Sequence, residues 1–205
     1  LIGRIESAAA DRLHPDTVAA MKLALARWNS QRQARALAHV TISKDLLNRH
    51  IHQVYDELPT FTDDDYSGVI LLWSPMGSGK TKRVGKPFAE WARSRGRFIA
   101  TCHRRSLVGE LAKVLGCDHY NDVTREIAWS VHSLATCLPS ITKSSHAQII
   151  NECEFLFVDE IAQVLRFLES DKACRTEVGT NAHVYEALRS LVARAKCVIG
   201  ADAGM

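Results

Sequence analysis

The spacing of hydrophobic positions changes near residue 68, and this change divides the chain into two parts. Upstream, apolar residues recur at helical intervals in DTVAAMKLALARW (16–28) and in KDLLNRHIHQVYDEL (44–58), which Pro59 ends. Asp16 follows Pro15 and is a candidate N-cap for the first of these helices. We therefore predict a helical N-terminal segment over residues 1–60, to which the sequence assigns no function.

Downstream of Gly68, short apolar runs alternate with helical patterns as far as the end of the chain. GVILLW, RFIATCH, EFLFVDE and CVIGADA have the length and composition of buried strands, and stretches such as RRSLVGELAKVLG and NAHVYEALRSLVARA lie between them. This alternation predicts an α/β domain over residues 61–205, with a mostly parallel central sheet covered by helices on both faces.

A glycine-rich turn joins the first strand to the first helix of this domain. SPMGSGKT (74–81) fits the phosphate-binding pattern G-x-x-x-x-G-K-[ST], except that Ser74 takes the place of the first glycine. Glycines allow backbone N–H groups to turn toward a phosphate, and the following helix adds its positive end. We predict that Lys80 reaches the β- and γ-phosphates of ATP and that Thr81 ligates Mg²⁺. The predicted nucleotide contacts are Pro75, Met76, Gly77, Ser78, Gly79, Lys80 and Thr81.

The apolar run EFLFVDE ends in two carboxylates, 79 residues beyond Lys80. At the end of a strand, Asp159 can hold Mg²⁺ through its water shell, and Glu160 can orient and deprotonate an attacking water. An acidic helix start is the structural alternative for this pair. Together with the glycine-rich turn, the pair predicts ATP hydrolysis, with Lys80 and Glu160 as the catalytic residues.

Five segments also occur in the order of motifs I, Ia, Ib, II and III of superfamily 2 helicases: SPMGSGKT, TCHRRSLVGELA, SVHSL, LFVDEIAQVLRFL and IGADAGM. Over about residues 68–205, the chain resembles the herpesvirus origin-of-replication-binding helicases and related bacterial plasmid and phage replication proteins. The resemblance implies a RecA-like P-loop NTPase domain, the first of two motor domains. A second domain with an arginine finger is expected in the full-length chain, so this segment alone should be a weak motor.

The same resemblance implies roles for residues outside the nucleotide loop. It places contacts to DNA phosphates in CHRRSL and SVHSL, and coupling to the second motor domain in GADAG. A solvated helix start is the alternative for the first segment, a packed core histidine for the second and a loop aspartate for the third. The implied nucleic-acid contacts are His103, Arg104, Arg105, Ser130 and His132, and the implied coupling residue is Asp202.

These observations favour the ATP-binding motor domain of a DNA helicase or translocase in replication initiation. ATP and Mg²⁺ are the expected cofactors, and single-stranded DNA and origin duplex are the expected nucleic-acid partners. Two other classes stay open, namely a P-loop phosphotransferase and an initiator module that binds ATP without motor activity.

Composition adds little to this hypothesis. The formal net charge of +3 is too slight to indicate a nucleic-acid partner by itself. No apolar run reaches the roughly 20 residues of a membrane span, and the six cysteines form no C-x-x-C pair. Buried free thiols in the cytoplasm, or in the nucleus for a viral protein, are the simplest interpretation. A chain that begins at Leu1 and stops directly after an apolar run is also expected to be a piece of a longer polypeptide.

Overall fold

The computed structural model describes residues 57–169 and 180–203. The chain divides into two units, and these residues belong to the second, Val54–Met205. The helices predicted upstream lie almost wholly outside the described residues. The described part contains a single six-stranded sheet in the order β1-β6-β5-β2-β4-β3, in which every pair is parallel. The predicted α/β fold with a parallel sheet is therefore confirmed and is consistent with a RecA-like domain.

The strands follow the apolar runs of the sequence. They are β1 (Gly68–Trp73), β2 (Arg97–Cys102), β3 (Asp118–His119), β4 (Ser133–Cys137), β5 (Cys153–Asp159) and β6 (Cys197–Asp202). In β4 all five residues are buried, as expected for a strand covered on both faces. Strand β3 has only two residues and contains no apolar run, so the sequence did not predict it.

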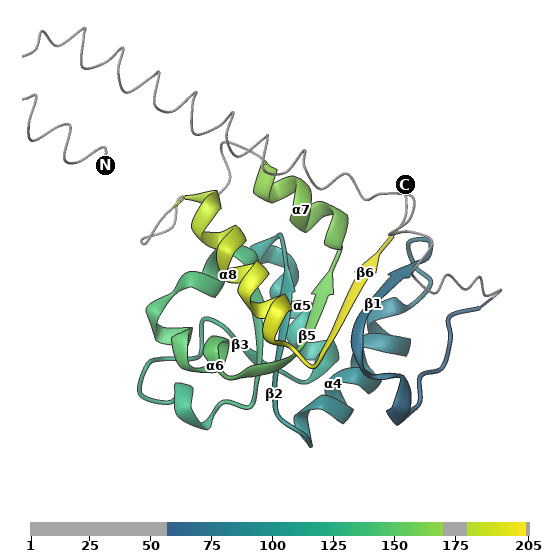
Figure 1. The fold of residues 1–205 in the computed structure, drawn as a ribbon, viewed down its shortest axis with the longest axis horizontal. Coiled ribbons are helices and arrows are strands. Elements are labelled where there is room, and N and C mark those ends of the chain that lie inside the picture. Colours follow the sequence, from purple (N-terminus) through teal and green to yellow (C-terminus); the bar gives the residue numbers. More distant parts are fainter. Residues whose placement is uncertain (1–56, 170–179, 204–205) are drawn as a thin grey trace, which may run out of the picture. The chain divides into compact units, whose positions relative to one another are not determined.

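Helices cover both faces of the sheet, as the alternating pattern predicted (Figure 1). On one face, α4 (Lys86–Arg93) and α5 (Arg105–Leu115) pack on β2, and on the other, α7 (Ile161–Glu169) packs on β6 and α8 (Asn181–Arg194) on β5. The short α6 (Ala147–Asn151) precedes β5. Short 3₁₀ turns are η1 (Asp63–Asp65), η3 (Ala128–Ser130), η4 (Leu138–Thr142) and η5 (Ser144–His146).

An aromatic cluster forms the core beneath α4. Phe88 is fully buried, and its ring meets Phe98 and Phe155 edge-on at centroid distances of 5.7 and 6.4 Å. Tyr66 and Trp91 complete the cluster, with their ring centroids 4.7 Å apart. Such pairs contribute roughly 0.5–1.5 kcal/mol beyond the burial of their area. The cluster therefore anchors α4, the helix that continues from the glycine-rich turn.

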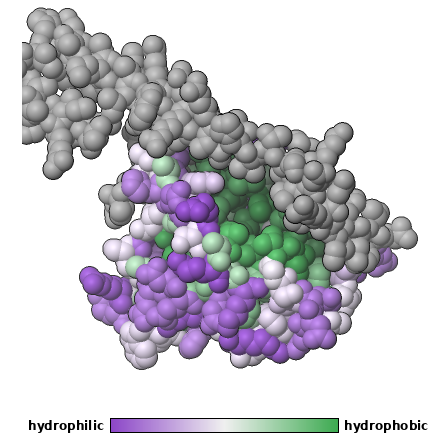
Figure 2. All heavy atoms as spheres, in the orientation of Figure 1, coloured by the Kyte–Doolittle hydropathy of each residue, from purple (hydrophilic) through white to green (hydrophobic). Residues whose placement is uncertain are grey.

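The edge strand β1 leaves one apolar face uncovered by the described residues. Val69, Leu71 and Trp73 alternate along the strand and are 61%, 69% and 78% exposed. Figure 2 shows an apolar surface on this side of the molecule, bordered by polar residues. The run GVILLW thus has the composition of a fully buried strand, although within the described residues it is buried on only one side.

The five described cysteines are free thiols, and all except Cys117 are buried. Burial raises the pKa of the Cys102 and Cys153 thiols to about 12, which makes them unreactive at neutral pH. The prediction of buried free thiols is confirmed for the four buried cysteines, Cys102, Cys137, Cys153 and Cys197. None of the described helices is both long and apolar enough to cross a bilayer.

Two helical glycines offer a matched test of this packing. A Cβ at Gly85 would lie 3.0–3.2 Å from the buried Phe157 ring and the Leu115 side chain, whereas a Cβ at Gly109 would meet nothing within 4 Å. We expect Gly85→Ala to lower the free energy of unfolding by about 1–3 kcal/mol through overpacking. Gly109→Ala should raise it by up to about 1 kcal/mol through helix propensity. Urea titration measures both, and equal effects of the two substitutions would contradict the described packing.

Candidate nucleotide-binding site

The glycine-rich turn leaves the carboxyl end of β1 and is tied back to the sheet. The Ser74 amide donates to the Asp202 carbonyl at 3.2 Å, and the Ser78 amide to the Pro75 carbonyl at 3.3 Å. Gly77 and Gly79 have φ angles of 79° and 87°, a region that a side chain rarely adopts. The backbone therefore favours glycine at both positions, of which Gly79 belongs to the phosphate-binding pattern and Gly77 lies within it. The hydroxyl of Ser74 lies 2.7 Å from that of Ser78, so the serine in place of the first glycine closes the turn with a hydrogen bond.

Lys80 is buried, with only 7% of its surface exposed. Its Nζ donates to the carbonyls of Ser74 and Pro75, at 2.8 and 3.1 Å. Lysine is almost never buried without partners, and here the partners are two carbonyls of the turn that precedes it. The ammonium group is therefore held at the turn, where a phosphate would lie.

The segment after Lys80 is a π-helix, η2 (Thr81–Gly85), that runs into α4. π-Helical turns are rare and are frequent at functional sites. Thr81 is its first residue, follows the turn directly and is partly exposed. The sequence predicted an uninterrupted helix here and carried no signal for the wider turn.

The carboxylates of Asp159 and Glu160 lie at the same edge of the sheet as the turn. Parallel strands place their carboxyl ends together, and only β6 separates β5 from β1, so the two loops are about 10 Å apart. Burial and, to a smaller extent, the neighbouring Glu160 carboxylate raise the pKa of Asp159 to about 6, while Lys80 acts in the opposite direction. The structure thus brings Lys80, Thr81, Asp159 and Glu160 to one edge.

Glu160 joins β5 to α7 through an unusual backbone conformation. Its φ of 54° is the only positive value among the described non-glycine residues. This left-handed conformation is disfavoured for a residue with a side chain by roughly 1–2 kcal/mol, and such strain is concentrated at functional sites.

Asp202 connects three parts of the site. Its Oδ2 accepts a hydrogen bond of 2.7 Å from the Ala162 amide in the first turn of α7. Its backbone carbonyl accepts the bond from Ser74 described above. Asp202, at the end of β6, therefore links the glycine-rich turn to α7, the helix that follows Glu160. The coupling to a second domain that was predicted for Asp202 stays a prediction.

The basic segment lies at the carboxyl end of β2, next to β5. Arg104 and Arg105 are exposed, and α5 begins at Arg105. The Arg104 Nε donates to His103 Nε2 at 2.9 Å. These three residues therefore share the sheet edge with the nucleotide loop.

Ser130 and His132 do not lie at this edge. Both precede β4, which begins at Ser133 and pairs in parallel with β2, so they lie at the amino ends of the strands. The Ser130 hydroxyl donates to the Ile127 carbonyl, which closes a local turn. These two residues therefore lie apart from Arg104, and the nucleic-acid contact implied for them stays a prediction.

At the carboxyl end of β4, the chain continues into η4 and then Lys143. Lys143 Nζ lies 5.0 Å from the centre of the Tyr120 ring. Lys143 is not among the predicted nucleic-acid contacts, whereas SVHSL, which supplies two of them, precedes and opens β4. The apolar run SLATC, which ends at Cys137, marks this strand in the sequence.

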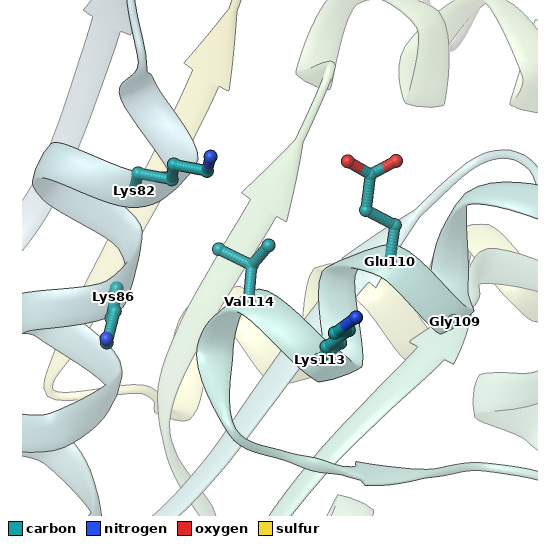
Figure 3. Close-up of a pocket in the computed structure, with 6 residues that line it drawn as sticks. All are labelled: Lys82, Lys86, Gly109, Glu110, Lys113 and Val114. Atoms are coloured by element: carbon teal, nitrogen blue, oxygen red, sulfur yellow. The ribbon is translucent and has the colours of Figure 1, made fainter.

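A separate surface cavity of about 870 Å³ lies between the helices that follow β1 and β2. It is lined by Lys82, Lys86, Gly109, Glu110, Lys113 and Val114. Figure 3 shows Lys82 and Lys86 on one side and Glu110 and Lys113 on the other. None of the predicted site residues lines this cavity. Within the described residues, no group of three or more His, Cys, Asp or Glu side chains is placed to hold a metal.

Comparison with known proteins shows limited similarity. No protein-family model matches the chain. An uncharacterized protein of Picosynechococcus sp. (strain PCC 7002) is 28% identical over 128 residues, which cover 60% of this chain and 12% of that protein. The crystal structure of the DUF1998 helicase MrfA is similar with a TM-score of 0.44 and 14% identity, over 79% of this chain and 28% of the other. This likeness is too distant to support a conclusion about function.

The raised pKa of Asp159 predicts a stability penalty at the site. The pKa rises from the ordinary 3.8 to about 6 in the folded chain, so folding favours the protonated form. The penalty is absent below pH 4 and complete above pH 6, and at 1.36 kcal/mol per pKa unit it amounts to roughly 1–3 kcal/mol. We therefore expect Asp159→Asn to stabilise the chain at pH 7.5 in the absence of Mg²⁺ and nucleotide, and to lose this advantage at pH 4.

Urea titration at the two pH values measures the effect. Asp64→Asn, at an exposed position in η1, is the matched control and should change little at either pH. A stabilisation by Asp159→Asn that is equal at both pH values would contradict the electrostatic origin.

Proposed function

We propose that this chain carries the ATP-binding motor domain of an ATP-dependent DNA helicase or translocase. The observation that carries the proposal is the convergence of two oppositely charged groups at one sheet edge. Lys80 is buried in a glycine-rich turn, and Asp159 lies partly buried at the end of the next strand but one, with Glu160 beside it. Neither a structural turn nor an acidic helix start explains why both charges lose water at the same edge.

The residues at this edge fit ATP with Mg²⁺. The backbone of residues 75–81 would bind the phosphates, with Lys80 at the β- and γ-phosphates and Thr81 and Asp159 at the metal. A carboxylate whose pKa is raised by burial and by Glu160 gains a counter-charge from a divalent cation. The small number of protein ligands suits Mg²⁺, which keeps several waters and is bound through one or two carboxylates and the substrate phosphates. When bound, the metal neutralises charge that develops on the phosphates.

Glu160 would act on the attacking water. Its carboxylate accepts one proton while the water oxygen bonds to the γ-phosphorus and the bond to the β-phosphate oxygen breaks, which yields ADP and phosphate. Only a correctly placed base performs this step, and the strained backbone at Glu160 fixes where its side chain leaves the sheet.

Arg104 and Arg105 would bind single-stranded DNA, which is the track along which the motor would move. They are exposed at the edge that holds the nucleotide loop, and arginine forms charge-assisted hydrogen bonds with phosphate groups. Such contacts hold single-stranded DNA without reading its sequence. The resemblance to origin-binding helicases adds replication initiation as the process and a second RecA-like domain as the partner in hydrolysis. An arginine finger from that domain would supply roughly 10³–10⁵ in rate.

The nucleotide site is tested with two substitutions. Lys80→Ala should abolish binding of a non-hydrolysable ATP analogue to residues 1–205, because the loop loses its buried cation. Glu160→Gln should keep that binding and, in the complete polypeptide, lower ATP turnover by about 10²–10⁴-fold. Calorimetry measures the first effect and phosphate release the second. Unchanged affinity in Lys80→Ala would refute the phosphate site, and unchanged turnover in Glu160→Gln would leave Glu160 a structural residue.

The track is tested by replacing Arg104 and Arg105 together with alanine. Binding of single-stranded DNA should weaken for every sequence alike, and each lost phosphate contact should reduce the slope of log affinity against log salt by roughly 0.7. Anisotropy titration of two unrelated oligonucleotides at several salt concentrations measures both. The double substitution of Arg189 and Lys196 with alanine, which removes the same charge from α8 and from the residue before β6, is the control and should bind like the wild type. Equal behaviour of the two double variants would contradict the assignment.

A further inference from the structure

His103 and Glu160 leave the sheet from neighbouring strands. Strands β2 and β5 pair in parallel, with Thr101 opposite Val158. His103 and Glu160 each lie two residues beyond that pair, one position past the end of their strands. Paired residues of adjacent strands are about 5 Å apart and project to the same face. The two side chains therefore start from neighbouring backbone positions.

The ring of His103 has one satisfied nitrogen and one that lacks a partner. Nε2 accepts the hydrogen bond from Arg104 Nε, so it carries no proton, and the neutral ring must carry its proton on Nδ1. Nδ1 is buried and has no hydrogen-bond partner among the described residues. A buried N–H group without an acceptor destabilises the fold, and such a group in a native structure calls for an explanation.

Glu160 is the acceptor that this donor lacks. In the described part of the chain its carboxylate makes no hydrogen bond or ion pair, although its backbone is held in a strained conformation. Burial lowers the pKa of His103 and the Arg104 guanidinium lowers it further, whereas the Glu160 carboxylate acts in the opposite direction. The charge of Glu160 thus favours the protonated ring, and pairing of the two groups requires the Glu160 side chain to turn toward Nδ1.

We propose that His103 is a positioning residue for Glu160, and that its Nδ1–H holds the Glu160 carboxylate away from the attacking water until nucleic acid binds. This inference rests on the proposed hydrolysis of ATP. Arg104 orients the ring through Nε2, and it is also an exposed candidate for phosphate contact. When a DNA phosphate binds the Arg104 guanidinium, Arg104 no longer donates to His103 Nε2. The His103 ring then loses the contact that fixes its orientation, and the Glu160 carboxylate is released. Binding of the track is thereby linked to hydrolysis through three adjacent side chains.

The first test observes the ring directly in ¹⁵N-labelled residues 1–205. Long-range ¹H–¹⁵N spectra show which nitrogen carries the proton, and His103→Asn identifies the signals of this residue. We expect the proton on Nδ1 in the free chain, and a shift of the Nδ1 resonance in Glu160→Gln and on addition of single-stranded oligonucleotide. A proton on Nε2, or an Nδ1 resonance that does not shift in Glu160→Gln, would overturn the proposal.

The second test measures ATP turnover of the complete polypeptide with and without single-stranded DNA. His103→Ala should raise the rate without DNA by roughly tenfold, the effect of removing one hydrogen bond to a charged group. The rate at saturating DNA and the KM for ATP should stay the same, so that stimulation by DNA is lost. His103→Asn, which keeps an N–H donor, should retain much of the stimulation. His183→Ala, at an exposed position in α8, is the matched control.

The outcomes separate this inference from the function on which it rests. A purely structural role of His103 would lower the two rates together and leave their ratio unchanged, and that result would overturn the inference alone. Absence of any turnover in the wild-type protein would overturn the proposed function, while the ring spectra would still test the pairing of His103 with Glu160.

Discussion

Parallel pairing of β1, β6, β5 and β2 is the constraint on which the candidate site depends. Parallel strands deliver all their carboxyl ends to one edge, so the loops after these four strands converge although they are far apart in sequence. Lys80, Glu160 and Asp202 meet there because each follows or ends a strand. The same rule excludes Ser130 and His132, which precede β4 and so lie at the other edge.

The converging loops carry charges and backbone conformations that do not favour folding. Lys80 is a buried ammonium group held by two carbonyls, and Asp159 is a partly buried carboxylate with a raised pKa. Glu160 adds a strained backbone. The remainder of the domain stabilises this edge, through the aromatic cluster around Phe88 and the strand pairs below it. A site that binds a charged ligand is expected to contain such unfavourable groups, because the ligand supplies the interactions that they lack.

Both strands that flank β5 contribute to the loop at its end. From β6, Asp202 accepts the amide of Ala162 and so fixes the first turn of α7. From β2, His103 places an unpartnered donor beside Glu160. The backbone around Glu160 is therefore fixed on one side, while its carboxylate has a proposed second position on the other. A general base with two positions offers a physical route by which the arginines at the end of β2 could influence hydrolysis.

Within the described residues, the sequence by itself determined four of the six strands, the helices between them, the glycine-rich turn and the acidic pair, because each depends on local periodicity or on residues adjacent in the chain. Gly77 and Gly79 have the positive φ angles that the pattern requires, and every predicted run from GVILLW to CVIGADA forms a strand. Only the tertiary structure decided which end of a strand a residue occupies. SVHSL could be placed before or after a strand with equal ease, and the register of β4 against β2 settled the choice.

The burial of Lys80, the π-helical turn, the positive φ of Glu160 and the orphaned nitrogen of His103 likewise had no signal in the sequence. These features arise where segments distant in the chain pack together. Packing sets which polar atoms lose water and which partners they find, and neither periodicity nor composition carries that information.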